Sequence, residues 1–325
     1  MTGRLTLLLS SPRVVPGVLT REAWQALDAA HEVLGRADEP QVLAVVDAGL
    51  QVAEPEHDDP PSLGRELVAR AVTGADVVWV VSSDGDPGLT DVVAMEVSRL
   101  EDAPEVEVVL GSHDAPGSRL LDLVAVMDRL RSPGGCPWDR EQTHTSLVPY
   151  LIEEAHEAAE ALEVGERDHM VEELGDVLLQ VAFHARVGEE DPTAPFDIDD
   201  VAAGIVAKLV RRHPHVFADG DATTPGEVET SWEAIKAAEK PGETGPLRGV
   251  PAGLPPLARA TKVVSRLRQA GLQEALDEAV SGDEPGARLL ALVAELTAAG
   301  TDPDTALRAA LRDLVERVGP SSERA

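Results

Sequence analysis

Two acidic segments determine how the middle of the chain folds: Glu153-Glu154-Ala155-His156-Glu157 and Glu172-Glu173-Leu174-Gly175-Asp176. Each segment carries three carboxylates, which lie within one arc of about 100° on a helix that advances about 100° per residue. Gly165 stands between the segments, and glycine commonly ends a helix in the left-handed conformation. The sequence therefore predicts two antiparallel helices whose acidic faces are turned toward each other.

Carboxylates gathered on facing helices favour a metal site. Like charges at these spacings destabilise a helix, and a bound cation removes the repulsion. Asp176 directly precedes the apolar residues 177–183, where an unpaired carboxylate is costly. Oxygen ligands favour Mg²⁺, with Mn²⁺ as a substitute, over zinc.

Two other interpretations fit the same pattern. Solvated acidic helix faces are common in a chain with 59 acidic residues. Glu153-x-x-His156 and Glu166-x-x-His169 also match the Glu-x-x-His spacing of di-iron carboxylate bundles. Glu166 and His169 fall in the predicted turn, however, so the second motif is not expected to face the first.

The composition excludes several classes of protein. With 28 basic and 59 acidic residues the formal charge is −31, which repels phosphate backbones and disfavours non-specific nucleic-acid binding. Cys136 is the single cysteine, so an internal disulfide is ruled out and a reducing compartment is expected. No apolar run reaches the roughly 20 residues of a membrane span. We therefore expect a cytoplasmic protein without nucleic-acid or membrane partners.

The N-terminal part of the chain alternates between strand and helix patterns. Apolar runs predict strands at residues 5–9, 42–46, 77–81 and 106–110, and periodicity predicts helices at residues 21–34, 63–72 and 90–100. This alternation is typical of βαβ units on a parallel sheet. Residues 1–112 are therefore predicted to form an α/β domain with a truncated parallel sheet, followed by a linker at residues 111–117.

Beyond the linker the strand pattern disappears. Helices are predicted at residues 118–131, 145–162, 168–187, 197–213, 225–240, 257–270 and 287–318. Residues 172–179 also align with residues 283–290, where Ala287 replaces Asp176. The chain is therefore predicted to be multi-domain, with an all-α domain at residues 118–240 and a degenerate helical second repeat at residues 245–325.

Cationic side chains gather on a later predicted helix. Lys208, Arg211 and Arg212 are spaced i, i+3 and i+4, which places them on one side of the helix. They could neutralise a polyphosphate or, as an alternative, complement the helix dipole. Trp232 and Lys236, with Lys240 one turn further, could stack a base and hold a phosphate, although a buried structural Trp fits the same spacing.

Five motifs in this region resemble, in the same order, those of the MazG nucleoside triphosphate pyrophosphohydrolases. The resemblance covers residues 118–240 and implies an all-α NTP pyrophosphatase fold, Mg²⁺ dependence and a homodimer or higher homo-oligomer. It also implies hydrolysis of NTPs and dNTPs to NMPs and dNMPs with release of pyrophosphate. The motifs are Gly135-Cys136-Pro137-Trp138-Asp139-Arg140-Glu141-Gln142-Thr143, Tyr150-Leu151-Ile152-Glu153-Glu154-x-x-Glu157, Glu173-Leu174-Gly175-Asp176-Val177-Leu178-Leu179-Gln180, Lys208-Leu209-Val210-Arg211-Arg212-His213-Pro214-His215-Val216-Phe217 and Trp232-Glu233-x-Ile235-Lys236.

The resemblance also implies roles for individual side chains. Four positions match the metal ligands of the family: Glu154, Glu157, Glu173 and Asp176. Glu153 matches an additional carboxylate, which is expected to orient the water that attacks the α-phosphorus. The side chains expected to bind substrate are Glu172, Lys208, Arg211, Arg212, Trp232 and Lys236.

The N-terminal region more weakly resembles the first half of a tetrapyrrole methylase, in Val15-Pro16-Gly17-Val18-Leu19-Thr20 and Gly85-Asp86-Pro87-Gly88. The stretch is too short for a whole methylase, so we expect it to be catalytically silent. The favoured interpretation of the whole chain is a hydrolase that cleans the nucleotide pool. Its alternatives are a nucleotide-sensing regulatory module that binds without turnover, and a methyltransferase role for the N-terminal region.

Overall fold

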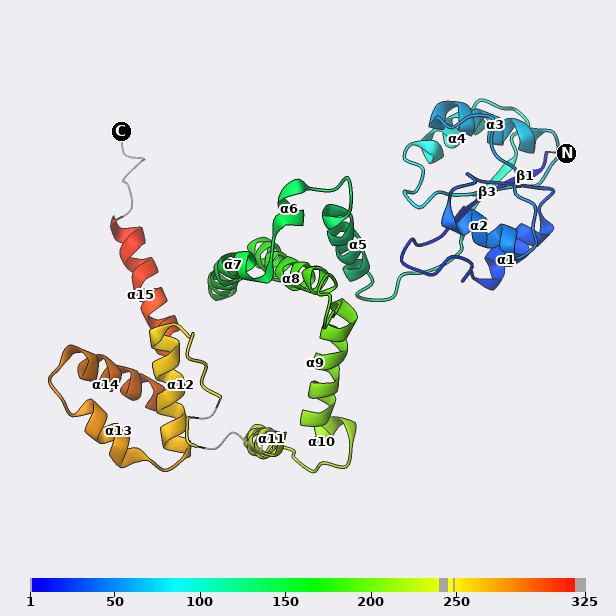
Figure 1. The fold of residues 1–325 in the computed structure, drawn as a ribbon. Helices are drawn as coiled ribbons and strands as arrows, with labels where there is room; N and C mark the ends of the chain where they lie inside the picture. Colours follow the sequence, from blue (N-terminus) through cyan, green and yellow to red (C-terminus); the bar gives the residue numbers. More distant parts are fainter. Residues whose placement is uncertain (1, 240–244, 248, 319–325) are drawn as a thin grey trace, which may run out of the picture. The chain divides into compact units, whose positions relative to one another are not determined.

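The computed structural model describes residues 2–239, 245–247 and 249–318 (Figure 1). The chain divides into two compact units, Met1–Ile205 and Val206–Ala325, which are described separately below as the first and second units. Each helix within the described residues is too short or too polar to cross a lipid bilayer.

The first unit begins with a four-stranded parallel sheet in the order β2-β3-β1-β4. The strands follow one another through helices, as expected for βαβ units. The strands are β1 (Arg4–Leu9), β2 (Glu32–Leu34), β3 (Val77–Val80) and β4 (Glu105–Leu110), and the helices are α1 (Arg21–Ala29), α2 (Pro40–Asp47), α3 (Pro60–Val72) and α4 (Leu89–Val97). The predicted α/β region with a small parallel sheet is therefore confirmed.

Helices cover both faces of this sheet (Figure 1). Leu5, Leu7 and Trp79 pack with α3 and α4 on one face. Leu8 and Val80 pack with α1 and α2 on the other face. Both faces of the central strands are therefore buried, which explains why β3 is apolar throughout and why β1 has apolar residues on both faces of the sheet.

One strand prediction is wrong. Residues 42–46 belong to helix α2, and the remaining strand of the sheet is β2, within residues predicted as the end of a helix. Pro40 occupies the first turn of α2, and Val42 and Val45, one helical turn apart, are buried against the sheet. A short apolar run suits a buried helix face as well as a strand, so periodicity alone could not separate the two.

The Gly85-Asp86-Pro87-Gly88 segment forms a tight turn after β3. Asp86 has a positive φ of 48°, which is uncommon for a residue other than glycine. Its buried carboxylate holds the turn by accepting hydrogen bonds from Trp79 Nε1 at 2.7 Å and from the Ser82 backbone N at 3.1 Å, and by pairing with Arg36. This motif therefore has a local structural use in the chain.

The rest of the first unit is helical, with α5 (Arg119–Arg131), α6 (Pro137–Glu141), α7 (His144–Val164) and α8 (Arg167–Gly188). A capping box between Thr143 and Ser146 begins α7, and Gly165 ends it in the left-handed conformation with a φ of 81°. Glu166 then caps α8, so α7 and α8 fold back on each other and pack side by side. The predicted helix pair is confirmed.

The second unit is helical throughout its described residues. Its elements are α9 (Ile198–Arg212), which spans the boundary between the units, α10 (Pro214–Phe217), α11 (Pro225–Glu239), α12 (Pro256–Gln269), α13 (Gln273–Val280), α14 (Pro285–Ala298) and α15 (Pro303–Val318). Val264, Leu276 and Val293 form the core of the C-terminal part.

The C-terminal helices differ from prediction in two respects. The helix predicted at residues 287–318 is divided into α14 and α15 around Gly300, whose φ is 73°. Helix α13 was not predicted. The three-part domain division and the degenerate repeat stay predictions, and the boundaries placed at residues 240 and 325 lie outside the described residues.

Candidate active site

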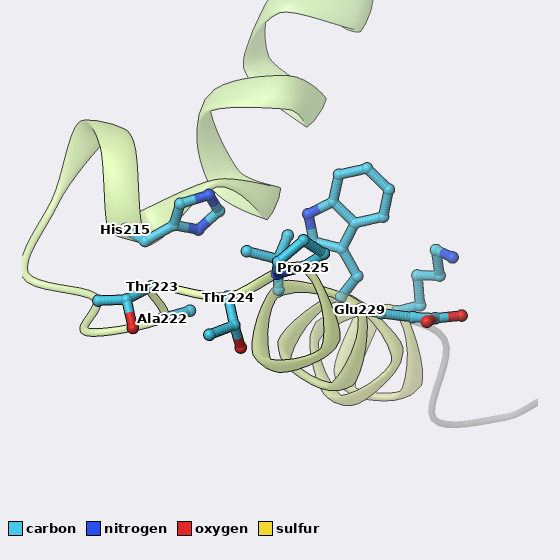
Figure 2. A pocket seen from close by; sticks show the side chains of 9 residues that line it. His215, Ala222, Thr223, Thr224, Pro225 and Glu229 are labelled. Carbon is cyan, nitrogen blue, oxygen red and sulfur yellow. The ribbon is translucent and has the colours of Figure 1, made fainter.

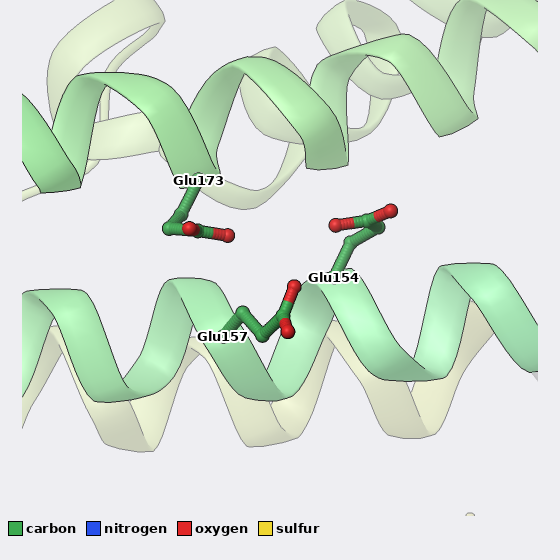
Figure 3. Close-up of side chains that lie close together, drawn as sticks. All are labelled: Glu154, Glu157 and Glu173. Atoms are coloured by element: carbon green, nitrogen blue, oxygen red, sulfur yellow. The ribbon is translucent and has the colours of Figure 1, made fainter.

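Three carboxylates meet where α7 faces α8. Glu154 and Glu157 lie one turn apart on α7, and Glu173 faces them from α8 (Figure 3). One oxygen from each of the three side chains lies within 4.8 Å of the others. The structure thus brings together three of the four residues predicted as metal ligands.

The negative charges in this carboxylate cluster repel one another. Burial raises the pKa of Glu154, and the charges of Asp176, Glu157, Glu153 and Glu173 raise it further. A raised pKa means that ionised Glu154 is unfavourable where it lies. A divalent cation among these oxygens would reverse this effect.

Glu173 has its two oxygens in different environments. Oε1 lies 3.2 Å from His169 Nε2, one turn earlier on α8. Oε2 is buried and has no hydrogen-bond partner within the described residues. A buried carboxylate oxygen without a partner is costly unless a ligand reaches it. Oxygen donors with one unpaired buried oxygen fit a hard divalent cation such as Mg²⁺.

The position of His169 corrects the sequence interpretation. His169 lies in the first turn of α8, not in a turn away from the acidic face, and it contacts Glu173. Glu166 accepts hydrogen bonds from the backbone N of His169 at 3.0 Å and of Asp168 at 3.4 Å, so it serves as the helix cap. The Glu166-x-x-His169 pair therefore does not have the inward-facing arrangement of a di-iron motif.

The remaining acidic candidates lie around this cluster. Asp176 lies on α8 one turn after Glu173 and has the largest charge effect on Glu154, but it is not among the three side chains whose oxygens converge. Glu153 is exposed beside Glu154 and also acts on its charge. Glu172 is exposed and is not among the main groups that shift Glu154.

The predicted cationic side chains lie in the second unit. Lys208 is exposed on α9. Arg211 and Arg212, in the last turn of α9, both form ion pairs with Glu239 at the end of α11. Hydrogen bonds from Arg212 and Arg211 lower the pKa of Glu239 to about 2. The sequence interpretation did not include this bridging carboxylate.

Trp232 and Lys236 line a pocket of about 690 Å³ in the second unit (Figure 2). Lys236 Nζ lies 5.8 Å from the centroid of the Trp232 ring. The His213 ring lies nearly perpendicular to the Trp232 ring, with 4.9 Å between the two centroids. The pocket is also lined by His215, Thr223 and Thr224, which the sequence interpretation did not assign to a site. Lys240 lies outside the described residues.

Facing carboxylates on an antiparallel helix pair define a helical region with an acidic site, whose oxygen donors are of the type that divalent cations prefer. The MazG nucleotide pyrophosphohydrolase domain matches residues 142–217 of the chain, which include the carboxylate cluster and the cationic end of α9.

Curated relatives give the family. The chain is 40% identical over 250 residues to the nucleoside triphosphate pyrophosphohydrolase of Mycolicibacterium smegmatis, covering 76% of this chain and 70% of the relative. It is 41% identical over 222 residues to the nucleoside triphosphate pyrophosphohydrolase/pyrophosphatase MazG of Thermotoga maritima, covering 60% of this chain and 82% of the relative. An uncharacterized 26.1 kDa protein from Streptomyces cacaoi is 49% identical over 232 residues, covering 71% of this chain and 94% of that protein. The chain belongs to the MazG family.

Proposed function

We propose that this chain is a hydrolase of the α–β phosphoanhydride bond, converting NTPs and dNTPs with water to NMPs and dNMPs and pyrophosphate. The observation that carries the proposal is the convergence of Glu154, Glu157 and Glu173, with Glu173 Oε2 buried and unpaired within the described residues. Curated relatives that are named for this activity support it.

The carboxylates of the cluster would hold Mg²⁺, or Mn²⁺ in its place, with Asp176 completing the set. A bound Mg²⁺ supplies neutralisation of the triphosphate charge. His169 contacts Oε1 of Glu173, and the buried Oε2, which has no partner in the described residues, would be a ligand for the metal. In this proposal these carboxylates and His169 bind and orient the metal, and none of them gives or accepts a proton during the reaction.

Glu153 is the residue that we assign to the attacking water. It is exposed, directly precedes Glu154 and is not one of the three converging carboxylates. Its carboxylate would accept the proton of the water as the new bond forms between the water oxygen and the α-phosphorus. The bond between the α-phosphorus and the bridging oxygen breaks, and pyrophosphate leaves with that oxygen.

Lys208, Arg211 and Arg212 would bind phosphate oxygens of the nucleotide, and Trp232 with Lys236 would bind its base and a phosphate. The pocket at Trp232 has an aromatic wall and hydroxyl groups from two threonines, which suits a nucleoside. Glu172 is the acidic member of this proposed substrate-binding set.

An exposed apolar stripe on α8 supports assembly into a homodimer or a higher homo-oligomer. Val171, Leu174, Leu178 and Val181 are exposed, and their helical spacing places them within about 80° of one another. A stripe of this kind commonly marks an interface. Leu174→Glu should convert the assembly to monomers in size-exclusion chromatography with light scattering. An unchanged mass would contradict the assignment of this face.

We place the enzyme in the cytoplasm, acting on small nucleotides and not on nucleic acids. The formal charge of −31 opposes long-range attraction of a polyanion, whereas a small metal-chelated nucleotide needs only local cationic groups. House-cleaning of the nucleotide pool is the role that this combination favours.

A substrate panel tests the proposal. Each NTP and dNTP is incubated with the protein and Mg²⁺, and products are identified by phosphorus NMR. We expect pyrophosphate and the monophosphate, loss of activity with EDTA, and a fall of at least about 100-fold in kcat/KM for Glu173→Gln. Release of orthophosphate, or turnover without a divalent metal, would refute it. Nucleotide binding without any product would instead support the regulatory alternative.

A further inference from the structure

One carboxylate joins the two arginines at the end of α9. Glu239 Oε1 accepts hydrogen bonds from Arg211 Nε at 2.7 Å and from Arg212 Nε at 3.3 Å. Glu239 Oε2 accepts a hydrogen bond from Arg212 Nη2 at 2.5 Å. All three side chains belong to the second unit, and each contact joins α9 to α11.

The two arginines are held in different ways. Arg212 presents the edge formed by Nε and Nη2 to both oxygens of Glu239, which is the side-on fork typical of firmly held pairs. Its side chain is 21% exposed. Arg211 donates to Glu239 through Nε, leaves both terminal nitrogens unused by Glu239, and is 54% exposed. Arg212 is therefore the anchored partner, and Arg211 extends toward solvent.

Glu239 lies where an ionised carboxylate is unfavourable without the two arginines. Glu239 is the last residue of α11, where the partial negative charge of the helix end disfavours a carboxylate. Hydrogen bonds from Arg212 and Arg211 nevertheless hold its pKa at about 2, so it stays ionised at neutral pH. Glu239 carries one negative charge and contacts two guanidinium groups, so it can neutralise only one of their two positive charges.

We propose that Glu239 is a positioning residue that, together with Arg212, fixes Arg211 so that its terminal nitrogens bind the phosphates of the nucleotide. The inference rests on the proposed function and refines it at one position. Arg211 contacts the phosphates of the nucleotide, whereas Arg212, grouped above with the phosphate-binding residues, acts together with Glu239 by holding Arg211 in place. An acidic plug is the opposite arrangement, in which Glu239 occupies the anion site and substrate must displace it. The two arrangements predict effects of opposite sign when Glu239 is replaced: a weaker affinity for phosphates if it positions Arg211, and a stronger affinity if it occupies the anion site.

The experiment is a double-mutant cycle on the full chain. Glu239→Gln, Arg211→Met and the double variant are compared with wild type by KM and kcat for an NTP, and by calorimetric Kd for inorganic tripolyphosphate. We expect Glu239→Gln to raise KM and the tripolyphosphate Kd by about 10-fold, which is about 1.4 kcal/mol, with kcat changed by less than about 3-fold. In the Arg211→Met background, Glu239→Gln should change neither value by more than about 2-fold.

Two further variants keep the outcome interpretable. Glu239→Asp retains the charge and shortens the side chain, so it should fold normally and raise KM by a smaller factor. Glu274→Gln removes an exposed carboxylate on α13 and should leave every value unchanged. A lower KM or tighter tripolyphosphate binding in Glu239→Gln would identify a plug and overturn the proposal. An equal effect of Glu239→Gln with and without Arg211 would also overturn it.

The tripolyphosphate measurement separates this inference from the proposed function. If the wild-type protein hydrolyses no nucleotide, the proposed function fails, while the coupling between Glu239 and Arg211 is still read from anion binding. If the protein hydrolyses nucleotides but the coupling is absent, only the positioning role of Glu239 fails.

Discussion

His169 Nε2 lies 3.2 Å from Oε1 of Glu173, while Oε2 of the same carboxylate is buried without a partner in the described part of the chain. The histidine and the carboxylate lie one turn apart on α8, so the helix itself sets their contact. One oxygen of Glu173 therefore contacts another side chain, the other is buried without a partner in the described residues, and one of the two lies within 4.8 Å of carboxylate oxygens of Glu154 and Glu157. Polar contacts from a neighbouring side chain commonly orient metal ligands.

Replacing His169 should weaken metal binding without unfolding the protein. His169→Ala removes the contact that orients Glu173, and we expect the Kd for Mn²⁺ or Mg²⁺ to rise by about 10- to 100-fold. His169→Gln, which can still donate a hydrogen bond, should recover part of the loss. Isothermal titration calorimetry measures both values. An unchanged Kd for His169→Ala would show that the histidine does not position Glu173.

Removing one charge from the carboxylate cluster should stabilise the metal-free protein. In Glu154→Gln the repulsion from Asp176, Glu157, Glu153 and Glu173 no longer acts on residue 154, so the metal-free Tm should rise. The same variant should lose the increase in Tm that Mg²⁺ gives the wild type, a stabilisation of about 2.7 kcal/mol when the free metal concentration is 100 times Kd.

Glu160→Gln, at an exposed position of the same helix, is the matched control for this comparison. It should change neither the metal-free Tm nor the response to Mg²⁺. A fall in the metal-free Tm of Glu154→Gln would mean that Glu154 makes a net favourable contact and that the carboxylates do not repel one another.

The raised pKa of Glu154 predicts how stability depends on pH. Between the ordinary glutamate pKa, about 4.3, and the raised value, the native state binds a proton that the unfolded chain has released. The contribution of Glu154 to metal-free stability is therefore present at lower pH and lost as pH rises through this window. Mg²⁺ needs the ionised form, so its stabilising effect should grow over the same window.

Thermal unfolding at closely spaced pH values, with Mg²⁺ and with EDTA, measures this dependence. The quantity to compare is the difference between wild type and Glu154→Gln, because carboxylates with lowered pKa, such as Glu190 and Asp86, contribute with the opposite sign. With EDTA, the amount by which Glu154→Gln is more stable than wild type should increase as pH rises. A constant difference across the window would refute the proton linkage.

The helix pair that carries the carboxylates could be predicted because its signals are local. Thr143 and Ser146 start α7, and Gly165 ends it, so the caps and the acidic spacing fix both helices and their facing surfaces. Residues 42–46 show the limit of such signals. Their apolar run carries no period, and only packing on the sheet through Val42 and Val45 makes them helical.

Parts of the candidate site depend on contacts that spacing does not reveal. Glu239 lies 27 residues from Arg212 in sequence, and nothing local to either residue indicates that α9 and α11 bring them together. His215 lines the pocket at Trp232 because the loop after α10 returns to the start of α11. His169 is different: its spacing of four residues from Glu173 was visible, but the predicted turn hid it.

Arg131 should be a strong determinant of the stability of the helical part of the first unit. Its side chain is 2% exposed at the end of α5 and forms hydrogen bonds with both oxygens of Glu190 after α8, at 3.1 and 2.7 Å. It also donates to the backbone carbonyls of Asp139 and Gln142, which hold α6. Arg131→Met removes the donor that these carbonyls share and leaves Glu190 without this partner, although the Asp139 carbonyl keeps a hydrogen bond from the Gln142 backbone N. We expect a loss of about 2–4 kcal/mol.

Urea unfolding followed by circular dichroism and by tryptophan fluorescence measures this loss. Trp138 lies in α6, with its ring centroid 5.9 Å from that of Tyr150, so its fluorescence should change when this packing is lost. Arg129→Met, which removes an exposed arginine from the same helix, should change stability by no more than about 0.5 kcal/mol. Arg131→Lys keeps the charge but cannot reproduce the forked contacts, so it should fall between the two. Equal stabilities for Arg131→Met and Arg129→Met would mean that burial of this guanidinium costs as much as its hydrogen bonds contribute.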